Sequence, residues 1–207
     1  MRAVTKKSTA MPMESLILAT SNVGKIHEFR HLLTPIRCIP QDELGIISIP
    51  ETKVTFVENA LLKARHASHC GNAPALADDS GLVVPALGGE PGIYSARYAG
   101  ETATTQQNNN LLLEKLRSIP PSQWQAYFYC VLVLVQHPHD PTPIIAYGQV
   151  QGLITDHPSG TQGFGYDPVF YLPNYQCTMA ELAIATKNTI SHRANAFREL
   201  KKQLSID

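Results

Sequence analysis

The stretch SLILATSNVGKIHEF, residues 15–29, decides the fold class. Its mostly apolar residues 16–20 are typical of a short buried strand, and turn-forming residues follow at positions 21–25. Apolar side chains then recur at helical spacing, at Ile26, Phe29 and Leu32. A strand, a tight loop and a helix in succession favour an α/β protein, and this geometry directs loop amides toward an anion.

Longer-range patterns add an antiparallel element. Two apolar runs, residues 125–135 and 144–151, flank the turn-rich segment QHPHDPTP and predict a hairpin. Together with the strand–loop–helix unit, the hairpin predicts an α/β fold with a mixed sheet. Further short strands are expected at residues 36–39 and 169–172.

Capping signals mark several helices. Thr55 and Glu58 form a T-x-x-E capping box at the start of a predicted helix over residues 55–71, where Gly71 is expected as the C-terminal cap. Thr178 and Glu181 form a second such box, which predicts another helix starting there. Helices are also expected over residues 104–117 and 191–204.

Composition narrows the class of protein. Charged residues make up 16% of the 207 residues, below the typical ~25%, and the formal net charge is zero. The chain has no run of Lys or Arg, which argues against duplex nucleic acid as the main partner. Its cysteines lie far apart without a C-x-x-C pair, so we expect a reducing compartment and no zinc or redox motif. They are Cys38, Cys70, Cys130 and Cys177.

The hydropathy pattern predicts a soluble, cytoplasmic protein. The basic N-terminus precedes an apolar run too short for a signal peptide, and the most apolar stretch, residues 126–135, is about half of what a bilayer span needs. We expect residues 1–14 to form a disordered tail and residues 15–207 to form one domain.

The loop after the first strand is a candidate phosphate-binding loop. It is not a Walker A loop, because Ala19 stands where that motif has Gly and Ile26 where it has Ser or Thr. The alternative is an ordinary strand-to-helix turn with a solvated lysine. The residues of the loop are Thr20, Ser21, Asn22, Val23, Gly24 and Lys25.

The segment ADDSG, residues 77–81, is a candidate metal site. Asp78 and Asp79 follow an apolar run, so we expect an acidic turn with at least one carboxylate at a strand end facing a cleft. Adjacent carboxylates repel each other unless a cation neutralises them, and a hard divalent ion does so. An exposed β-turn is the alternative. Glu51 would join this site only if it folds beside Asp79, and Lys63 could face a ligand from its helix.

Two further segments could bind the rest of a nucleotide. Phe164 and Tyr166 lie in the glycine-rich segment GTQGFGYDP, and could stack on a base or pack into the core. Lys187, His192 and Arg193 precede or open the last predicted helix, where they could donate to a ligand or point to water. Combined with the candidate loop and metal site, these residues favour a metal-dependent nucleoside-triphosphate hydrolase.

Five segments in a fixed order give the chain a family resemblance: LATSNVGKIHEF, TFVENALLKARHA, ALADDSGLVVPALGGEPGIYSARYAG, GFGYDPVF and ISHRANA. They resemble the inosine triphosphate pyrophosphatase family, whose members hydrolyse dITP, ITP and XTP, and the resemblance spans residues 15–204. It implies an elongated α/β structure with a long mixed sheet, two lobes and a central substrate cleft. It also implies a homodimer and Mg²⁺ as cofactor.

The resemblance assigns roles by position. Residues 20–25 would cradle the triphosphate, Lys63 would meet the phosphates, and Asp79 would be metal ligand and general base, helped by Asp78. Glu51 would share the magnesium. The residues implied to bind the nucleoside or touch the substrate are Ser80, Phe164, Gly165, Tyr166, Asp167, Lys187, His192 and Arg193. One departure is Ser21, which replaces the glycine usual in the family and would be strained at a positive φ.

Three other functions remain open at the level of sequence. A related pyrophosphatase would act on pyrimidine or modified nucleotides. A nucleotide-binding module without catalysis is disfavoured, because extra carboxylates do not help to bind phosphate. A phosphatase with Asp79 as covalent nucleophile is disfavoured because Asp78 and Asp79 are adjacent, whereas the expected signature is D-x-D.

Overall fold

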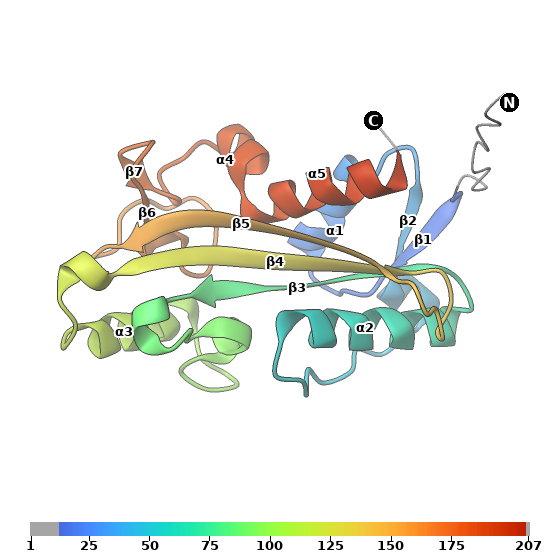
Figure 1. Ribbon diagram of the computed structural model, residues 1–207, viewed down its shortest axis with the longest axis horizontal. Helices are drawn as coiled ribbons and strands as arrows, with labels where there is room; N and C mark the ends of the chain where they lie inside the picture. Colours follow the sequence, from blue (N-terminus) through green and yellow to red (C-terminus); the bar gives the residue numbers. More distant parts are fainter. Residues whose placement is uncertain (1–12, 206–207) are drawn as a thin grey trace, which may run out of the picture.

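The computed structural model describes residues 13–205, which form a mixed seven-stranded sheet with helices on both faces (Figure 1). The strand order is β2-β1-β3-β4-β5-β6-β7; β1 pairs in parallel with β2 and β3, and all other neighbours are antiparallel. The predicted α/β class and mixed sheet are therefore confirmed. The strands are β1 (Ser15–Leu18), β2 (Arg37–Pro40), β3 (Ala75–Val83), β4 (Gln125–Val135), β5 (Ile144–Ile154), β6 (Phe170–Leu172) and β7 (Cys177–Thr178).

The helices form a layer on each side of the sheet. In Figure 1, α1, α4 and α5 lie above the long strands and α2 and α3 lie below them. The α-helices are α1 (Val23–Leu32), α2 (Phe56–Gly71), α3 (Thr105–Leu116), α4 (Ile184–Ile190) and α5 (His192–Leu204). Short 3₁₀ helices are η1 (Gln41–Leu44), η2 (Pro85–Leu87), η3 (Gly92–Arg97), η4 (Pro121–Gln123) and η5 (Asp167–Val169).

The hydrophobic core has three parts, which the sheet separates. One lies between the sheet and helices α1 and α5, where the rings of Phe29 and Phe197 meet edge to face at 4.9 Å. Another lies between the sheet and the alanine-rich face of α2. The third, around Phe128 and Phe170, fills the end of the molecule that carries α3 and β6. The two 11-residue strands β4 and β5 run along the molecule and form the predicted hairpin.

Two helix signals have different outcomes in the structure. Thr55 caps α2 as predicted, but Gly71 is still helical and Asn72 takes the left-handed cap at φ 46°. A Cβ at Gly71 would lie 2.2 Å from Cδ1 of Ile17, so a larger residue there would require the Ile17 side chain to shift. The helix predicted from Thr178 is wrong. Thr178 ends β7, and its amide donates to the Glu181 carboxylate at 2.7 Å, within a turn.

The predicted tail falls mostly outside the described residues, since residues 1–12 are not among them. Met13 packs against the core beneath α1 and α5, and the carbonyl of Glu14 accepts from the amide of Arg37 at 3.1 Å. Within the described part of the chain, none of the helices combines the length and hydropathy that a bilayer span requires.

Candidate active site

Asp78 and Asp79 lie on the part of β3 that pairs with only one neighbouring strand. Strand β1 pairs with β3 only at Ala75 and Leu76, whereas β4 pairs with β3 along its whole length. Asp78 and Asp79 therefore follow the point at which β1 ends, on an edge of β3 that β1 leaves uncovered. The predicted acidic turn and the alternative of an exposed turn are both wrong. Pairing with β4 keeps the segment extended, and the two residues are only 1% and 5% exposed.

Asp78 faces the side of the sheet that carries α1 and α5. Its Oδ2 lies 2.8 Å from Nζ of Lys25 and within 3.5 Å of the Ser80 hydroxyl. Burial opposes ionisation of Asp78, but Lys25, Arg193 and Lys63 outweigh it and lower the pKa of the carboxyl to about 2. Asp78 is thus ionised at neutral pH, as a counter-ion for these cations.

Asp79 faces the opposite side of the sheet, toward α2, because successive side chains of a strand alternate. Its Oδ1 accepts from the Ser80 amide at 3.0 Å and lies 3.9 Å from Nζ of Lys63. Its Oδ2 is buried without a hydrogen-bond partner among the described residues. Burial raises the pKa of Asp79 to about 6, with Glu51 and Asp78 adding to the effect and Lys63 opposing it.

Glu51 joins Asp79 through a shared lysine. Nζ of Lys63 lies 2.5 Å from Oε1 of Glu51, and Nη1 of Arg97 lies 3.5 Å from Oε2. Burial opposes ionisation of Glu51, but Lys63, Lys25 and Arg97 together lower its pKa. The structure therefore brings together the two carboxylates predicted to hold a metal. The role of Arg97 as a partner of Glu51 was not predicted, because no sequence pattern connects two residues so far apart in the chain.

This arrangement fits a hard divalent cation. Glu51 and Asp79 supply carboxylate oxygens, the ligands that Mg²⁺ prefers, and Oδ2 of Asp79 is a buried acceptor without a partner among the described residues. No three His, Cys, Asp or Glu side chains converge within residues 13–205. Mg²⁺ commonly keeps several water ligands and uses one or two carboxylates, so two protein ligands suffice.

The candidate phosphate loop runs from the end of β1 to the first turn of α1. Asn22 caps the helix, and its Oδ1 accepts from the amide of Lys25 at 3.1 Å. The Thr20 hydroxyl accepts from the amide of Asn22 at 3.2 Å. Ser21 does not have a positive φ, so the expected strain is absent; its hydroxyl donates to Asp42 at 2.7 Å. Lys25 is only partly exposed, and its ammonium is paired with Asp78 instead of pointing freely into solvent.

The two aromatic residues of the glycine-rich segment GTQGFGYDP lie in different environments, Phe164 at the surface and Tyr166 in the core. Phe164 is 63% exposed, and Nζ of Lys187 lies 5.0 Å from its ring centre. Tyr166 is buried and donates to the carbonyl of Ser95 at 2.9 Å, so packing into the core holds for Tyr166 alone. Asp167 accepts from the amide of Phe164 at 2.8 Å and forms an ion pair with Lys187.

A neighbouring asparagine fixes the middle of the same loop. Asn109 of α3 donates to the carbonyl of Gly165 at 3.2 Å, and its Oδ1 is buried without a partner among the described residues. Gly165 has φ of 61°, which suits glycine. Asn109 was not predicted, because its contact with Gly165 spans 56 residues.

The side chains of the first residues of α5 turn inward, so the alternative of solvated side chains is wrong for His192 and Arg193. The imidazole of His192 stacks on Phe128 at 5.0 Å, and its Nδ1 is buried without a partner among residues 13–205. Burial holds the pKa of His192 well below its ordinary value, and Arg193 and Lys187 add to this effect. Nη1 of Arg193 lies 2.7 Å from Glu28 of α1, while its Nε is another buried atom that lacks a partner there.

Four predicted cations therefore line one region, each held by an internal carboxylate. The pairs are Lys25 with Asp78, Lys63 with Glu51, Lys187 with Asp167 and Arg193 with Glu28. Unpartnered polar atoms of Asp79, His192 and Arg193 are left over, and such atoms are rare in folded proteins unless a ligand, ion or water meets them. Paired cations together with unpartnered nitrogens of His192 and Arg193 suit an anionic ligand that also carries hydrogen-bonding groups.

Comparison with known proteins agrees with this geometry. A model of the Ham1 family matches residues 16–203. A dITP/XTP pyrophosphatase of Legionella pneumophila (strain Paris) is 60% identical over 93% of this chain and 99% of its own. One from Xanthomonas campestris pv. campestris (strain 8004) is 53% identical over 93% and 98%.

Solved structures give the same result. A HAM1 protein from Coxiella burnetii superimposes with a TM-score of 0.90 at 45% identity, covering 93% of this chain and 99% of that one. Family match, sequence identity and fold all agree with the resemblance predicted from the five motifs. The chain belongs to the Ham1 family.

Proposed function

We propose that this protein hydrolyses the non-standard purine nucleoside triphosphates dITP, ITP and XTP to the nucleoside monophosphate and pyrophosphate, and so cleanses the nucleotide pool. The observation that carries the proposal is the set of four paired cations around the acidic pair, together with the unpartnered nitrogens of His192 and Arg193. Relatives more than half identical to this chain are named dITP/XTP pyrophosphatases, which supports the same reaction.

The triphosphate would lie along the uncovered edge of β3. The N-terminus of α1 and the ammonium of Lys25 would meet its phosphates from one face, and Lys63 from the other. Mg²⁺, held by Glu51 and Asp79, would neutralise phosphate charge and polarise the phosphoryl oxygens. Asp78 contributes by holding Lys25 in place, since its buried carboxylate already has cationic partners.

Asp79 would act as general base. In the metal-free protein its pKa of about 6 lies close to neutral pH, where the carboxylate is ionised and can accept a proton. Water attacks the α-phosphorus, a new P–O bond forms, and the bond from the α-phosphorus to the bridging oxygen breaks. Asp79 takes the proton of the water, and pyrophosphate leaves with its charge offset by Lys25 and Lys63.

Base selection would rest on His192 and Arg193. Hypoxanthine and xanthine present a 6-oxo acceptor, and the unpartnered nitrogens of these two residues are available to donate to it. Adenine presents a 6-amino donor, which would leave a buried donor unpaired. Sites of this kind reject the mismatched analogue by roughly 10⁴–10⁵-fold. Phe164, exposed beside Lys187, would stack on the base.

The test incubates the protein and Mg²⁺ with ITP, dITP, XTP, ATP, GTP and dTTP and measures pyrophosphate and orthophosphate separately. Pyrophosphate from the first three, with little from the others, is expected. Orthophosphate would indicate a phosphatase, preference for dTTP a pyrimidine enzyme, and binding without product a non-catalytic module. Arg193→Ala should reduce the preference for ITP over ATP, and omission of Mg²⁺ should abolish turnover.

We further propose that the enzyme acts in the cytoplasm as a homodimer. The support is the family resemblance, together with cysteines that form no pair among the described residues. Sedimentation equilibrium of the full chain checks the assembly, and a monomer at working concentration would contradict it.

A further inference from the structure

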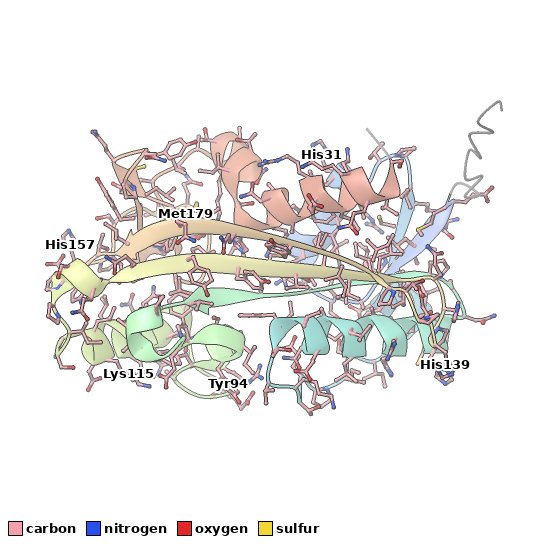
Figure 2. All side chains as sticks on the ribbon, viewed as in Figure 1. His31, Tyr94, Lys115, His139, His157 and Met179 are labelled. Carbon is pink, nitrogen blue, oxygen red and sulfur yellow. The ribbon has the colours of Figure 1, made fainter. Side chains whose placement is uncertain are left out.

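Helix α1 carries the sequence HEFRH, residues 27–31, which the proposed function does not use in full. His27 and His31 are four residues apart and so lie on one face of the helix, where side chains at this spacing are neighbours. Both are exposed, whereas Phe29 between them is buried in the core. Figure 2 shows His31 on the same side of the sheet as α5.

The two histidines share a cavity. A hollow of about 240 Å³ lies between α1 and α4, and it is lined by Gly24, His27, Glu28, His31, Leu32, Ile184 and Asn188. Neither imidazole forms a hydrogen bond, ion pair or ring contact with the residues that the structure describes. Two neighbouring imidazoles thus border one hollow with their ring nitrogens uncommitted.

We propose that His27 and His31 form a binding site for a transition-metal ion of the zinc class. Imidazole nitrogen is a preferred ligand of Zn²⁺, and two histidines at this spacing on a helix are a known chelating arrangement. Zn²⁺ takes about four ligands in a tetrahedral arrangement, so water or small anions would complete the shell. The site is separate from the carboxylates of Glu51 and Asp79, which suit a harder ion.

The sequence matches the H-E-x-x-H pattern of zinc proteases, but the structure does not support that chemistry. Glu28 is committed to Arg193 at 2.7 Å and so is not free to act as a base. Among the described residues no third His, Cys, Asp or Glu converges with the two histidines. The proposed site therefore binds metal reversibly through two side chains and performs no hydrolysis.

Helix α2 offers a competing pair of the same spacing, His66 and Cys70. The Cys70 sulfur lies 3.9 Å from Nε2 of His66, but the same Nε2 is 2.9 Å from the carbonyl of Ile47. A metal there would have to displace that hydrogen bond or use the other nitrogen. His66 and Cys70 therefore make a matched control for the pair on α1.

The test is a Zn²⁺ titration of the full chain against a chromophoric chelator, without nucleotide. His27→Gln and His31→Gln should each weaken Zn²⁺ binding by at least the roughly 10–100-fold that loss of an outer-shell partner costs. Cys70→Ser and His66→Gln should leave the affinity unchanged. Both changes on α1 are at exposed positions, so circular dichroism should show an unaltered fold.

Absorption spectra of the same proteins with Co²⁺ in place of Zn²⁺ identify the type of ligand atom. Co²⁺ bound by the wild type should show visible bands of a nitrogen and oxygen site, without thiolate charge transfer in the near ultraviolet. Failure of the wild type to compete with the chelator would overturn the proposal. So would binding that survives His27→Gln and His31→Gln, or that disappears in Cys70→Ser.

Discussion

The ammonium nitrogen of Lys25 lies 2.8 Å from Oδ2 of Asp78, where the first turn of α1 reaches the middle of β3. This contact links the phosphate loop to the sheet through a carboxylate that is only 1% exposed. The loop thus owes the placement of its cation to a buried charge, and the consequences are measurable.

Asp78→Asn should destabilise the fold at neutral pH by about 3–5 kcal/mol, the usual result of removing one partner of a buried ion pair. The folded-state pKa of about 2 lies below the ordinary 3.8, so the stabilisation is present above pH 4 and is lost as pH falls toward 2. Urea unfolding at several pH values should show the difference between variant and wild type shrinking over this range. Asp156→Asn, at an exposed position, is the control and should change little.

Asp79 should behave in the opposite way. Its pKa of about 6 in the fold lies above the ordinary 3.8, so the folded state binds more protons between these values and loses stability as pH rises through them. Asp79→Asn should therefore raise the melting temperature at pH 7.5 in EDTA, with no gain at pH 4, and cut turnover by orders of magnitude. Near-normal turnover would remove Asp79 from the role of base.

Arg193 and Glu28 should be energetically coupled, because their ion pair at 2.7 Å is largely buried. We expect Arg193→Gln and Glu28→Gln each to destabilise the protein, and the double variant to lose less than the sum by about 0.5–3 kcal/mol. Urea unfolding of the four proteins in the cycle measures this term. Strict additivity would show that the pair contributes nothing.

Gly148 should be intolerant of any side chain. A Cβ there would lie 2.2 Å from the carbonyl oxygen of His192 and 2.3 Å from the amide of Ala196, both backbone atoms of α5. Gly148→Ala should destabilise the fold by about 1–3 kcal/mol and raise KM for ITP, because it displaces the start of α5. Gln149→Ala, on the other face of β5, should leave both unchanged.

Local signals explain why much of the fold could be predicted. The loop capped by Asn22, the helix capped by Thr55 and the β4–β5 hairpin each depend on residues close in sequence. Strand β3 could not be read correctly, since Asp78 and Asp79 resemble a turn until β4 pairs with them. The same limit hid Glu28 as a partner of Arg193, because 165 residues separate them.

Asp78 and Asp79 are adjacent in the segment ADDSG, and this spacing decides which face of β3 each carboxylate occupies. In an extended strand, neighbouring residues point to opposite faces, so D-D places its two carboxylates on opposite faces of the sheet, whereas D-x-D would place both on one face. Separation lets one carboxyl keep a pKa of about 2 and its neighbour one of about 6. An insertion of one residue between Asp78 and Asp79 would place both carboxylates on a single face of the sheet. The direct adjacency of the two residues is therefore what allows one carboxyl with a low pKa and one with a raised pKa to lie on opposite sides of the same strand.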